Sequence, residues 1–245
     1  MAESEEQAAR WDLWASHDDR VFATADPRPA GMFLAKIAAG GHALELGAAT
    51  GRVAVALAEQ GVPVTALDIS PEMIRRIEDA RGSLPVTARV GDMAEVPVDG
   101  AFSLVYATLS TFFGLLTQER QIECFTNVAR VLAPDGKFVI EAFVPLRQGI
   151  VTRGQQLAIR AMAPGCVDLS ATLHDAANQR ITFQEIRVDA DGLRMLPIEI
   201  RYVWPSELDL MARLAGMSLH ARYGDWDCGA FSSASLRHIS LYETI

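Results

Sequence analysis

Cysteine is scarce in this 245-residue chain, and the three that occur lie far apart. Cys124, Cys166 and Cys228 are odd in number and form no C-x-x-C pair, so the sequence contains neither a disulfide framework nor a cysteine-based zinc motif. We therefore expect a reduced protein that works in the cytoplasm.

The sequence also lacks a long apolar run and an excess of basic residues. No stretch approaches the roughly 18 apolar residues of a membrane helix, and the acidic opening MAESEEQAARWDLW is unlike a signal peptide. The formal net charge is -9, whereas nucleic acids and anionic membranes bind basic faces. We expect neither as a partner, and no metal, because no histidine or acid cluster has ligand spacing.

Up to about residue 145, segments typical of strands alternate with segments typical of helices. The expected strands are the apolar stretches 42–47, 63–68, 85–90, 101–107 and 137–144. The expected helices are 52–61, 70–82 and 117–136; Ser70 is a natural N-cap and Pro71 suits the first helical position. This alternation predicts a doubly wound, mostly parallel, Rossmann-like α/β sheet.

Beyond Pro145 the pattern changes to alternation of apolar and polar residues. Segments 166–175, 180–190 and 194–204, separated by turn signals, predict a small antiparallel β insertion after the fifth strand. A helix at 206–216 follows, and strands at 217–224 and 237–243 bring the main sheet to seven strands.

Small and acidic residues stand where three of the expected parallel strands end. Gly47 and Gly51 follow the first strand, Asp68 ends the second, 21 residues after Gly47, and Asp92 with Met93 follows the third. Glycine lets the backbone approach a ligand, and an acid at this distance can accept both hydroxyls of a ribose. Each residue alone also suits a plain turn, but their joint order predicts a nucleoside-type cofactor at the carboxyl edge of the sheet.

A family resemblance rests on segments in a fixed order. The segments are LELGAATGR, ALDIS, VGDM, FSLVYATLSTFFGLL and VLAPDGKFVIEAF, and with them the chain resembles the class I S-adenosylmethionine-dependent methyltransferases over nearly its whole length. The resemblance implies S-adenosyl-L-methionine as cofactor and S-adenosyl-L-homocysteine as product. It divides a single domain, 1–245, into a lid helix (1–27), a cofactor-binding core (28–145), the insertion (146–204) and closing elements (205–245).

The resemblance also implies roles for individual residues. The loop with Glu45, Gly47, Ala49 and Gly51 passes the methionine part of the cofactor, with Ala49 where the family usually has glycine. The other implied contacts are Asp68 on the ribose, Ile69 on the adenine ring, Asp92 with Met93 on the adenine amino group, and backbone of Ala107 and Thr108 near the methionine amine. A dinucleotide enzyme needs G-x-G-x-x-G, and from Gly47 its second and third glycine places hold Ala49 and Arg52.

The antiparallel insertion indicates which class of acceptor to expect. It resembles that of small-molecule methyltransferases from natural-product pathways, including amino-sugar N,N-dimethyltransferases. We therefore expect metal-free transfer to a nitrogen, or an oxygen, of a small molecule, with the insertion as a candidate homodimer surface. Some such enzymes carry a histidine or tyrosine base after the fourth strand, but TLSTFFGLL has neither, so His17 is our candidate base.

The N-terminal segment RWDLWASHDDR is the expected lid, because Trp11 and Trp14 lie three apart on one helical face. The alternative is an amphipathic helix that only closes over the core. The candidate acceptor-site residues are Trp11, Trp14, Phe112, Phe113, Glu141, Tyr202 and Trp204.

Two other functions stay open at this stage. A catalytically inactive regulator or scaffold that binds the same cofactor fits the missing base motif. A nucleic-acid or protein methyltransferase fits less well, because the chain is acidic and residues 107–110 read ATLS rather than Asn/Asp-Pro-Pro-Tyr/Phe/Trp.

Overall fold

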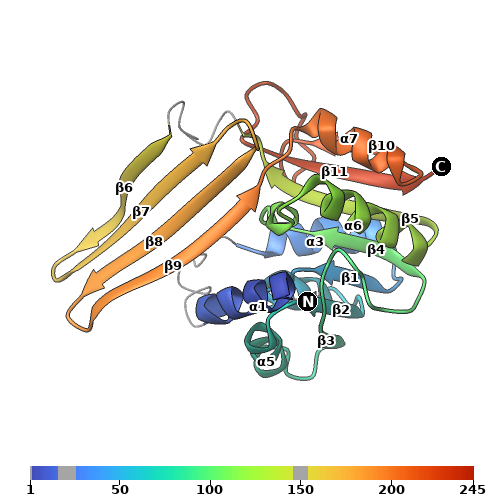
Figure 1. Cartoon of the computed structure of the whole chain (residues 1–245). Coiled ribbons are helices and arrows are strands. Elements are labelled where there is room, and N and C mark those ends of the chain that lie inside the picture. Colours follow the sequence, from blue (N-terminus) through green and yellow to red (C-terminus); the bar gives the residue numbers. More distant parts are fainter. Residues whose placement is uncertain (1, 16–25, 146–153) are drawn as a thin grey trace.

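The computed structural model describes residues 2–15, 26–145 and 154–245, and it contains two β-sheets (Figure 1). One sheet has seven strands in the order β10-β11-β5-β4-β1-β2-β3, and the other has four in the order β6-β7-β8-β9. The predicted fold class, a mostly parallel Rossmann-like sheet with an antiparallel insertion after the fifth strand, is confirmed.

The strand order of the seven-stranded sheet determines where a ligand can bind at its carboxyl edge. Its strands are β1 (Ala43–Leu46), β2 (Val64–Asp68), β3 (Val86–Val90), β4 (Phe102–Ala107), β5 (Leu132–Phe143), β10 (Met217–Tyr223) and β11 (Arg237–Thr244). Strands β1 to β5 pair in parallel, and β11 joins β5 antiparallel. The order reverses between β1 and β4, so the loops after these strands diverge and open a crevice at the carboxyl edge.

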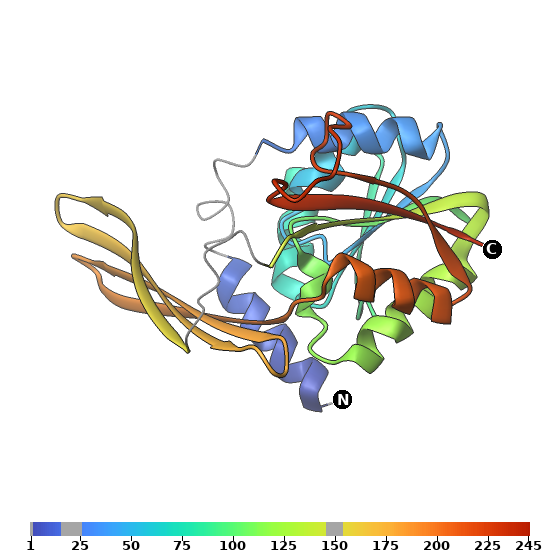
Figure 2. The same cartoon turned by 90° about the horizontal axis from the view of Figure 1, so that it is seen from above.

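Helices cover both faces of this sheet (Figure 2). The helices are α1 (Ala2–Ala15), α3 (Arg28–Ala38), α4 (Arg52–Ala58), α5 (Pro71–Ala80), α6 (Gln118–Val131) and α7 (Pro205–Leu214), with a 3₁₀ turn η1 (Thr111–Gly114). Apolar residues of α3 and α4 form one core cluster, and those of η1, α6 and α7 form the other. The two clusters fix the sheet from both sides, which keeps the loops at its carboxyl edge in place.

The ends of two helices show how local sequence sets them. Ser70 caps α5 as predicted, since its Oγ accepts a hydrogen bond of 3.1 Å from the Met73 backbone N. Helix α6 ends at Val131, before the predicted end at 136, and β5 begins directly at Leu132. The reason is Pro134, which disfavours helical backbone at the residue before it and lacks the N–H that a helix needs.

The four-stranded sheet is an antiparallel meander that projects from the core (Figures 1 and 2). Its strands are β6 (Gln155–Ala163), β7 (Cys166–Asp175), β8 (Arg180–Asp189) and β9 (Gly192–Arg201). Strand β6 was not predicted. It is an edge strand whose side chains are mostly exposed on both faces, so its sequence has no clear alternation.

A buried polar network joins the meander to the core. Arg201, the last residue of β9, pairs with Glu207 of α7 at 2.7 Å and donates to Gln121 of α6 at 2.6 Å. Gln121 returns a hydrogen bond to the Arg201 carbonyl, and Gln179 donates to Glu207 at 2.7 Å. Burial acts to raise the pKa of Glu207, but these hydrogen bonds outweigh it and hold that pKa below its usual value.

No helix in the described parts of the chain is long and apolar enough to cross a membrane.

Candidate functional site

The glycine loop after β1 has a left-handed backbone at three of its five positions. Gly47, Ala49 and Gly51 have φ of 64°, 50° and 83°. A Cβ at Gly47 would lie 2.0 Å from the Thr111 methyl, so this position requires glycine for space as well as for conformation. Ala49 adopts the same backbone with a Cβ, at a cost of roughly 1–2 kcal/mol. Such strain is typical of functional loops.

Asp68 ties this loop to the end of β2. Its Oδ2 accepts a hydrogen bond of 2.8 Å from the Ala49 N, and its Oδ1 accepts one of 2.9 Å from the Ser70 N. Asp68 and Ile69 both line a cavity beside the glycine loop.

Asp92 and Met93, in the loop after β3, line the same cavity. The Oδ1 of Asp92 accepts from the Ala94 N at 2.8 Å, and its Oδ2 pairs with Arg120 of α6 at 2.5 Å. Asp68 and Asp92, which the sequence predicts at neighbouring strand ends, therefore share one cavity.

The cavity is narrow, and α1 closes it. Its volume is about 60 Å³, well below the roughly 300–1,000 Å³ of a typical ligand site. Gln7 and Trp11 of α1 form one wall. Residues that the sequence did not single out complete the lining: Gln7, Met73, Gly91, Thr111, Gly114 and Leu115. Most of them flank motif residues, and only Gln7 and Met73 carried no signal that sequence motifs could provide.

Polar contacts hold α1 over the cavity. Gln7 Nε2 donates to the Gly114 carbonyl at 3.0 Å. Asp12 accepts a short hydrogen bond from the Ser70 hydroxyl and another, of 3.2 Å, from the Glu72 N. An acid at this place also favours the positive end of the α5 dipole. Helix α1 is thus attached to the start of α5, just after Asp68, and to the 3₁₀ turn after β4.

The two tryptophans of α1 lie in different environments. Trp11 lines the cavity, whereas Trp14 is fully buried against Met73 and Leu196, and its Nε1 donates to the Pro197 carbonyl at 3.0 Å. Their ring centroids are 6.4 Å apart. His17, the candidate base, lies outside the described residues.

Glu45, in β1 just before the glycine loop, does not line the cavity. Its carboxyl group is buried and accepts a hydrogen bond of 3.2 Å from the Tyr106 hydroxyl. Burial raises the pKa of Glu45 to about 8, although hydrogen bonds from Tyr106 and the Ala54 backbone oppose the shift. The residue is therefore largely a neutral acid near pH 7, bound to β4 and α4.

This raised pKa predicts a pH-dependent stability. Between about pH 4.5 and 8 the unfolded chain releases the Glu45 proton while the folded chain keeps it, so stability falls as pH rises. Glu45→Gln places a neutral side chain of the same shape at this position at every pH. Relative to the parent, its free energy of unfolding should therefore rise by several kcal/mol between about pH 4.5 and 8. Urea unfolding at several pH values measures the difference. Glu59→Gln, at an exposed acid, is the control, and parallel curves for parent and Glu45→Gln would refute the assignment.

Glu141 holds the loop after β4 by a hydrogen bond and does not line the narrow cavity. The Oε2 of Glu141 accepts from the Leu109 N at 2.8 Å, and its Oε1 pairs with Arg237 at 2.8 Å. Ala107 and Thr108 are buried at the end of β4. The Leu109 backbone is left-handed, with φ of 52°, so Glu141 stabilises an uncommon loop conformation.

The remaining aromatic candidates pack in the core or at the junction with the meander. Phe112 and Phe113 are fully buried and make edge contacts with Phe125 and Phe143, respectively. The Tyr202 hydroxyl lies 3.1 Å from His174 Nε2, and its ring touches that of Trp204. None of these four candidates lines the narrow cavity.

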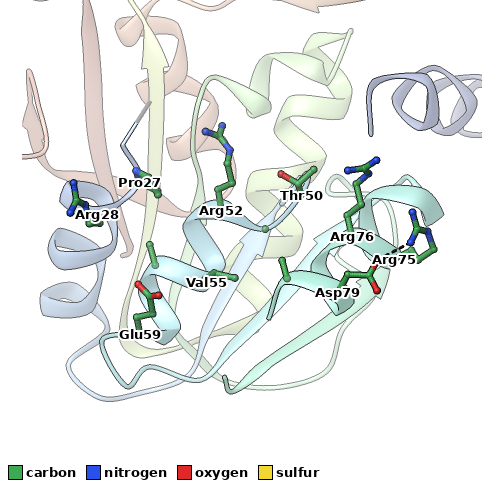
Figure 3. A pocket seen from close by; sticks show the side chains of 12 residues that line it. Pro27, Arg28, Thr50, Arg52, Val55, Glu59, Arg75, Arg76 and Asp79 are labelled. Atoms are coloured by element: carbon green, nitrogen blue, oxygen red, sulfur yellow. Dashed lines mark hydrogen bonds and ion pairs between the residues drawn. The ribbon is translucent and has the colours of Figure 1, made fainter. Parts of the chain in front are cut away.

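A larger hollow of about 560 Å³ lies against α4 and α5 (Figure 3). Arg28, Arg52, Arg75 and Arg76 surround it, with Glu59 and Asp79. Arg75 is held by Asp79 and by Glu72 of the same helix, at 2.7 Å and 2.6 Å. The lining of this hollow includes neither Asp68 nor Asp92, so we assign the candidate site to the narrow cavity.

Among the residues that the structure describes, no three histidine, cysteine, aspartate or glutamate side chains meet as metal ligands would.

Comparison with known proteins adds independent findings. A family model described as a methyltransferase domain matches residues 43–136. The structure of the CcbJ methyltransferase from Streptomyces caelestis superposes with a TM-score of 0.85, at 33% identity over 89% of each chain. The cypemycin N-terminal methyltransferase of a Streptomyces species is 28% identical over 203 residues, 82% of each chain. CalS10, an amino pentose methyltransferase from Micromonospora echinaspora, shares the fold at 18% identity, with a TM-score of 0.69 over 89% of this chain and 92% of that one.

Proposed function

Because the chain belongs to the S-adenosylmethionine-dependent methyltransferases, we propose that it methylates a nitrogen of a small natural-product acceptor. The meeting of Asp68, Asp92 and the glycine loop in one cavity carries the proposal. A nitrogen acceptor, rather than an oxygen, is supported by relatives whose names specify N-terminal or amino-sugar methylation.

The cavity residues fit the cofactor. Asp68 would accept the ribose hydroxyls and Asp92 the adenine amino group, while Ile69, Met93 and Leu115 would hold the adenine ring between apolar side chains. The left-handed glycine loop lets its backbone lie close to the methionine part. The backbone of Ala107 and Thr108 would serve the methionine amine from the neighbouring strand end.

The chain's own contribution is orientation and exclusion of water. When bound, S-adenosylmethionine supplies an electrophilic methyl group, so we propose that no metal is required. Helix α1 acts as the lid: it must shift to admit a ligand of nucleoside size, and its return brings Trp11 over the site. His17 remains our candidate for the base that takes the proton from the acceptor.

The acceptor would enter between this lid and the meander. Phe112, Phe113, Glu141, Tyr202 and Trp204 would form or support its walls, with Trp14 fixing the lid. The net charge of -9 supports a small-molecule rather than a nucleic-acid acceptor. Three free thiols support our proposal of a reducing, cytoplasmic setting.

A homodimer through the meander is a further part of the proposal. Strand register places a set of half- to three-quarters-exposed apolar side chains on one face of the meander: Leu157, Ile159, Met162, Leu173, Leu193 and Met195. Apolar surface of this extent in a soluble protein commonly marks an interface. The mass of the protein in solution tests it.

An activity assay with a cofactor variant tests the function. We expect the protein to convert S-adenosylmethionine and an amine acceptor to S-adenosylhomocysteine and the N-methylated acceptor, detected by mass spectrometry. Asp68→Ala should raise the Kd for S-adenosylhomocysteine by about 5- to 150-fold, since it removes a charge-assisted pair of hydrogen bonds. Asp79→Ala, at an exposed acid of α5, is the control for calorimetry.

Two outcomes of these measurements would count against the proposal. An unchanged Kd in Asp68→Ala would remove the ribose assignment. Tight cofactor binding with no turnover on any amine or hydroxyl acceptor would favour an inactive regulator or scaffold.

A further inference from the structure

Arg120, in the first turn of α6, reaches across to the loop after β3. Its Nη2 lies 2.5 Å from Asp92 Oδ2, and its Nη1 lies 2.5 Å from Glu123 Oε2 on its own helix. The Arg120 side chain is about one-third exposed and that of Asp92 one-tenth exposed. The contact is therefore a largely shielded ion pair between α6 and the loop after β3.

Helix α6 holds the same loop at a second point. Asn127, seven residues after Arg120 and so on the same helical face, donates from Nδ2 to the Ala94 carbonyl at 2.8 Å. The Ala94 N in turn donates to Asp92 Oδ1 at 2.8 Å. Both carboxylate oxygens of Asp92 are thus fixed by groups that lie outside the cavity.

This arrangement determines what Asp92 can recognise. Arg120 and the Ala94 N each contact one oxygen of the carboxylate, and Asp92 also lines the cavity. A carboxylate paired with an arginine presents acceptor oxygens and no donor. It therefore suits the 6-amino group of adenine and opposes a 6-oxo group, whose oxygen is also an acceptor.

We propose that Arg120 is a positioning residue that fixes Asp92 for recognition of the purine 6-amino group and so sets the preference for an adenosyl cofactor over a 6-oxo purine one. The inference rests on the proposed contact between Asp92 and adenine. Without Arg120 the carboxylate loses its fixed orientation, and the discrimination between the two purines declines while apolar contacts to the ring persist.

Calorimetry with two ligands tests this role. The full-length protein is titrated with S-adenosylhomocysteine and with its 6-oxo analogue, S-inosylhomocysteine, and the ratio of the two Kd values is the readout. We expect the parent to prefer the adenosyl ligand and Arg120→Gln to reduce this preference about tenfold, the effect of one charge-assisted hydrogen bond. Glu123→Gln, which leaves the Asp92 pair in place, should keep the parent ratio.

The outcomes separate this inference from the assignment of Asp92. If the parent shows no preference, or Asp92→Asn retains it, the adenine contact itself is wrong. If Asp92→Asn loses the preference but Arg120→Gln weakens both ligands equally or neither, Arg120 is only structural and the inference is overturned. Should Arg120→Gln fail to fold, Arg120→Lys, which keeps the charge without the fork, replaces it and is expected to lie between parent and Asp92→Asn.

Discussion

Arg201→Met should lower the free energy of unfolding by about 3–5 kcal/mol, the usual loss when one partner of a buried ion pair is removed. The side chains of Arg201 and Glu207 are only 10% and 18% exposed. Without the guanidinium, the largely buried Glu207 carboxylate loses its positive partner. The side-chain oxygen of Gln121 also loses the hydrogen bond that it accepts from Arg201. Urea unfolding followed by fluorescence measures the change.

Two further variants make this expectation specific. Arg194→Met removes an arginine with a 41% exposed side chain that pairs with the more exposed Asp191 at 3.5 Å, and it should change stability by no more than about 0.5 kcal/mol. Adding Glu207→Leu to Arg201→Met removes the unpaired charge and should restore part of the loss. A single variant as stable as the parent would mean that the pair does not hold the meander on the core.

The polar junction also matters for the acceptor side. Gln179 donates to the Tyr202 carbonyl at 3.0 Å and to Glu207, so the network sets the direction in which the chain leaves β9. Tyr202 and Trp204 follow directly. The meander is thus held by directional hydrogen bonds, which fix its angle better than apolar packing alone.

Much of the fold could be predicted because its strands are short apolar runs between helical segments. Helix α3 was not predicted, and the reason is visible in Gly31, a weak helix former in the middle of it. A Cβ at Gly31 would lie 2.8 Å from the Ala56 carbonyl oxygen, so α3 and α4 pack too closely for any other residue. The glycine that weakens the sequence signal is the one that the packing requires.

The site was predictable only in its motif positions. Parallel strands end at one edge, so spacing alone brings Asp68 and Asp92 together. Spacing does not say on which face of its strand or helix a side chain lies. Glu45 lies against the Tyr106 hydroxyl and not in the cavity lining, and the link between Asp92 and Arg120, 28 residues apart, had no signal in the sequence.

Trp14→Ala is expected to lower turnover far more than it raises the Kd for S-adenosylhomocysteine. Truncation of a buried tryptophan costs about 3–5 kcal/mol, and here the lost contacts are those between α1 and Met73, Leu196 and Pro197. Because α1 is a peripheral helix attached through a few described side-chain contacts, the loss should appear as detachment of the lid and not as global unfolding. The cofactor acids stay in place, while Trp11 leaves the cavity wall.

Hydrogen exchange of residues 2–15 distinguishes detachment from a purely structural effect. In Trp14→Ala these amides should exchange much faster while those of β1 and β2 keep their protection. Trp14→Phe retains most of the packing without the bond to Pro197 and should lie in between, and Leu13→Ala, on the exposed side of α1, should behave as the parent. If Trp14→Ala turned over acceptor at the parent rate with α1 detached, then α1 would not be a lid. Its contacts with Ser70 and Gly114 would then serve only to cover the core.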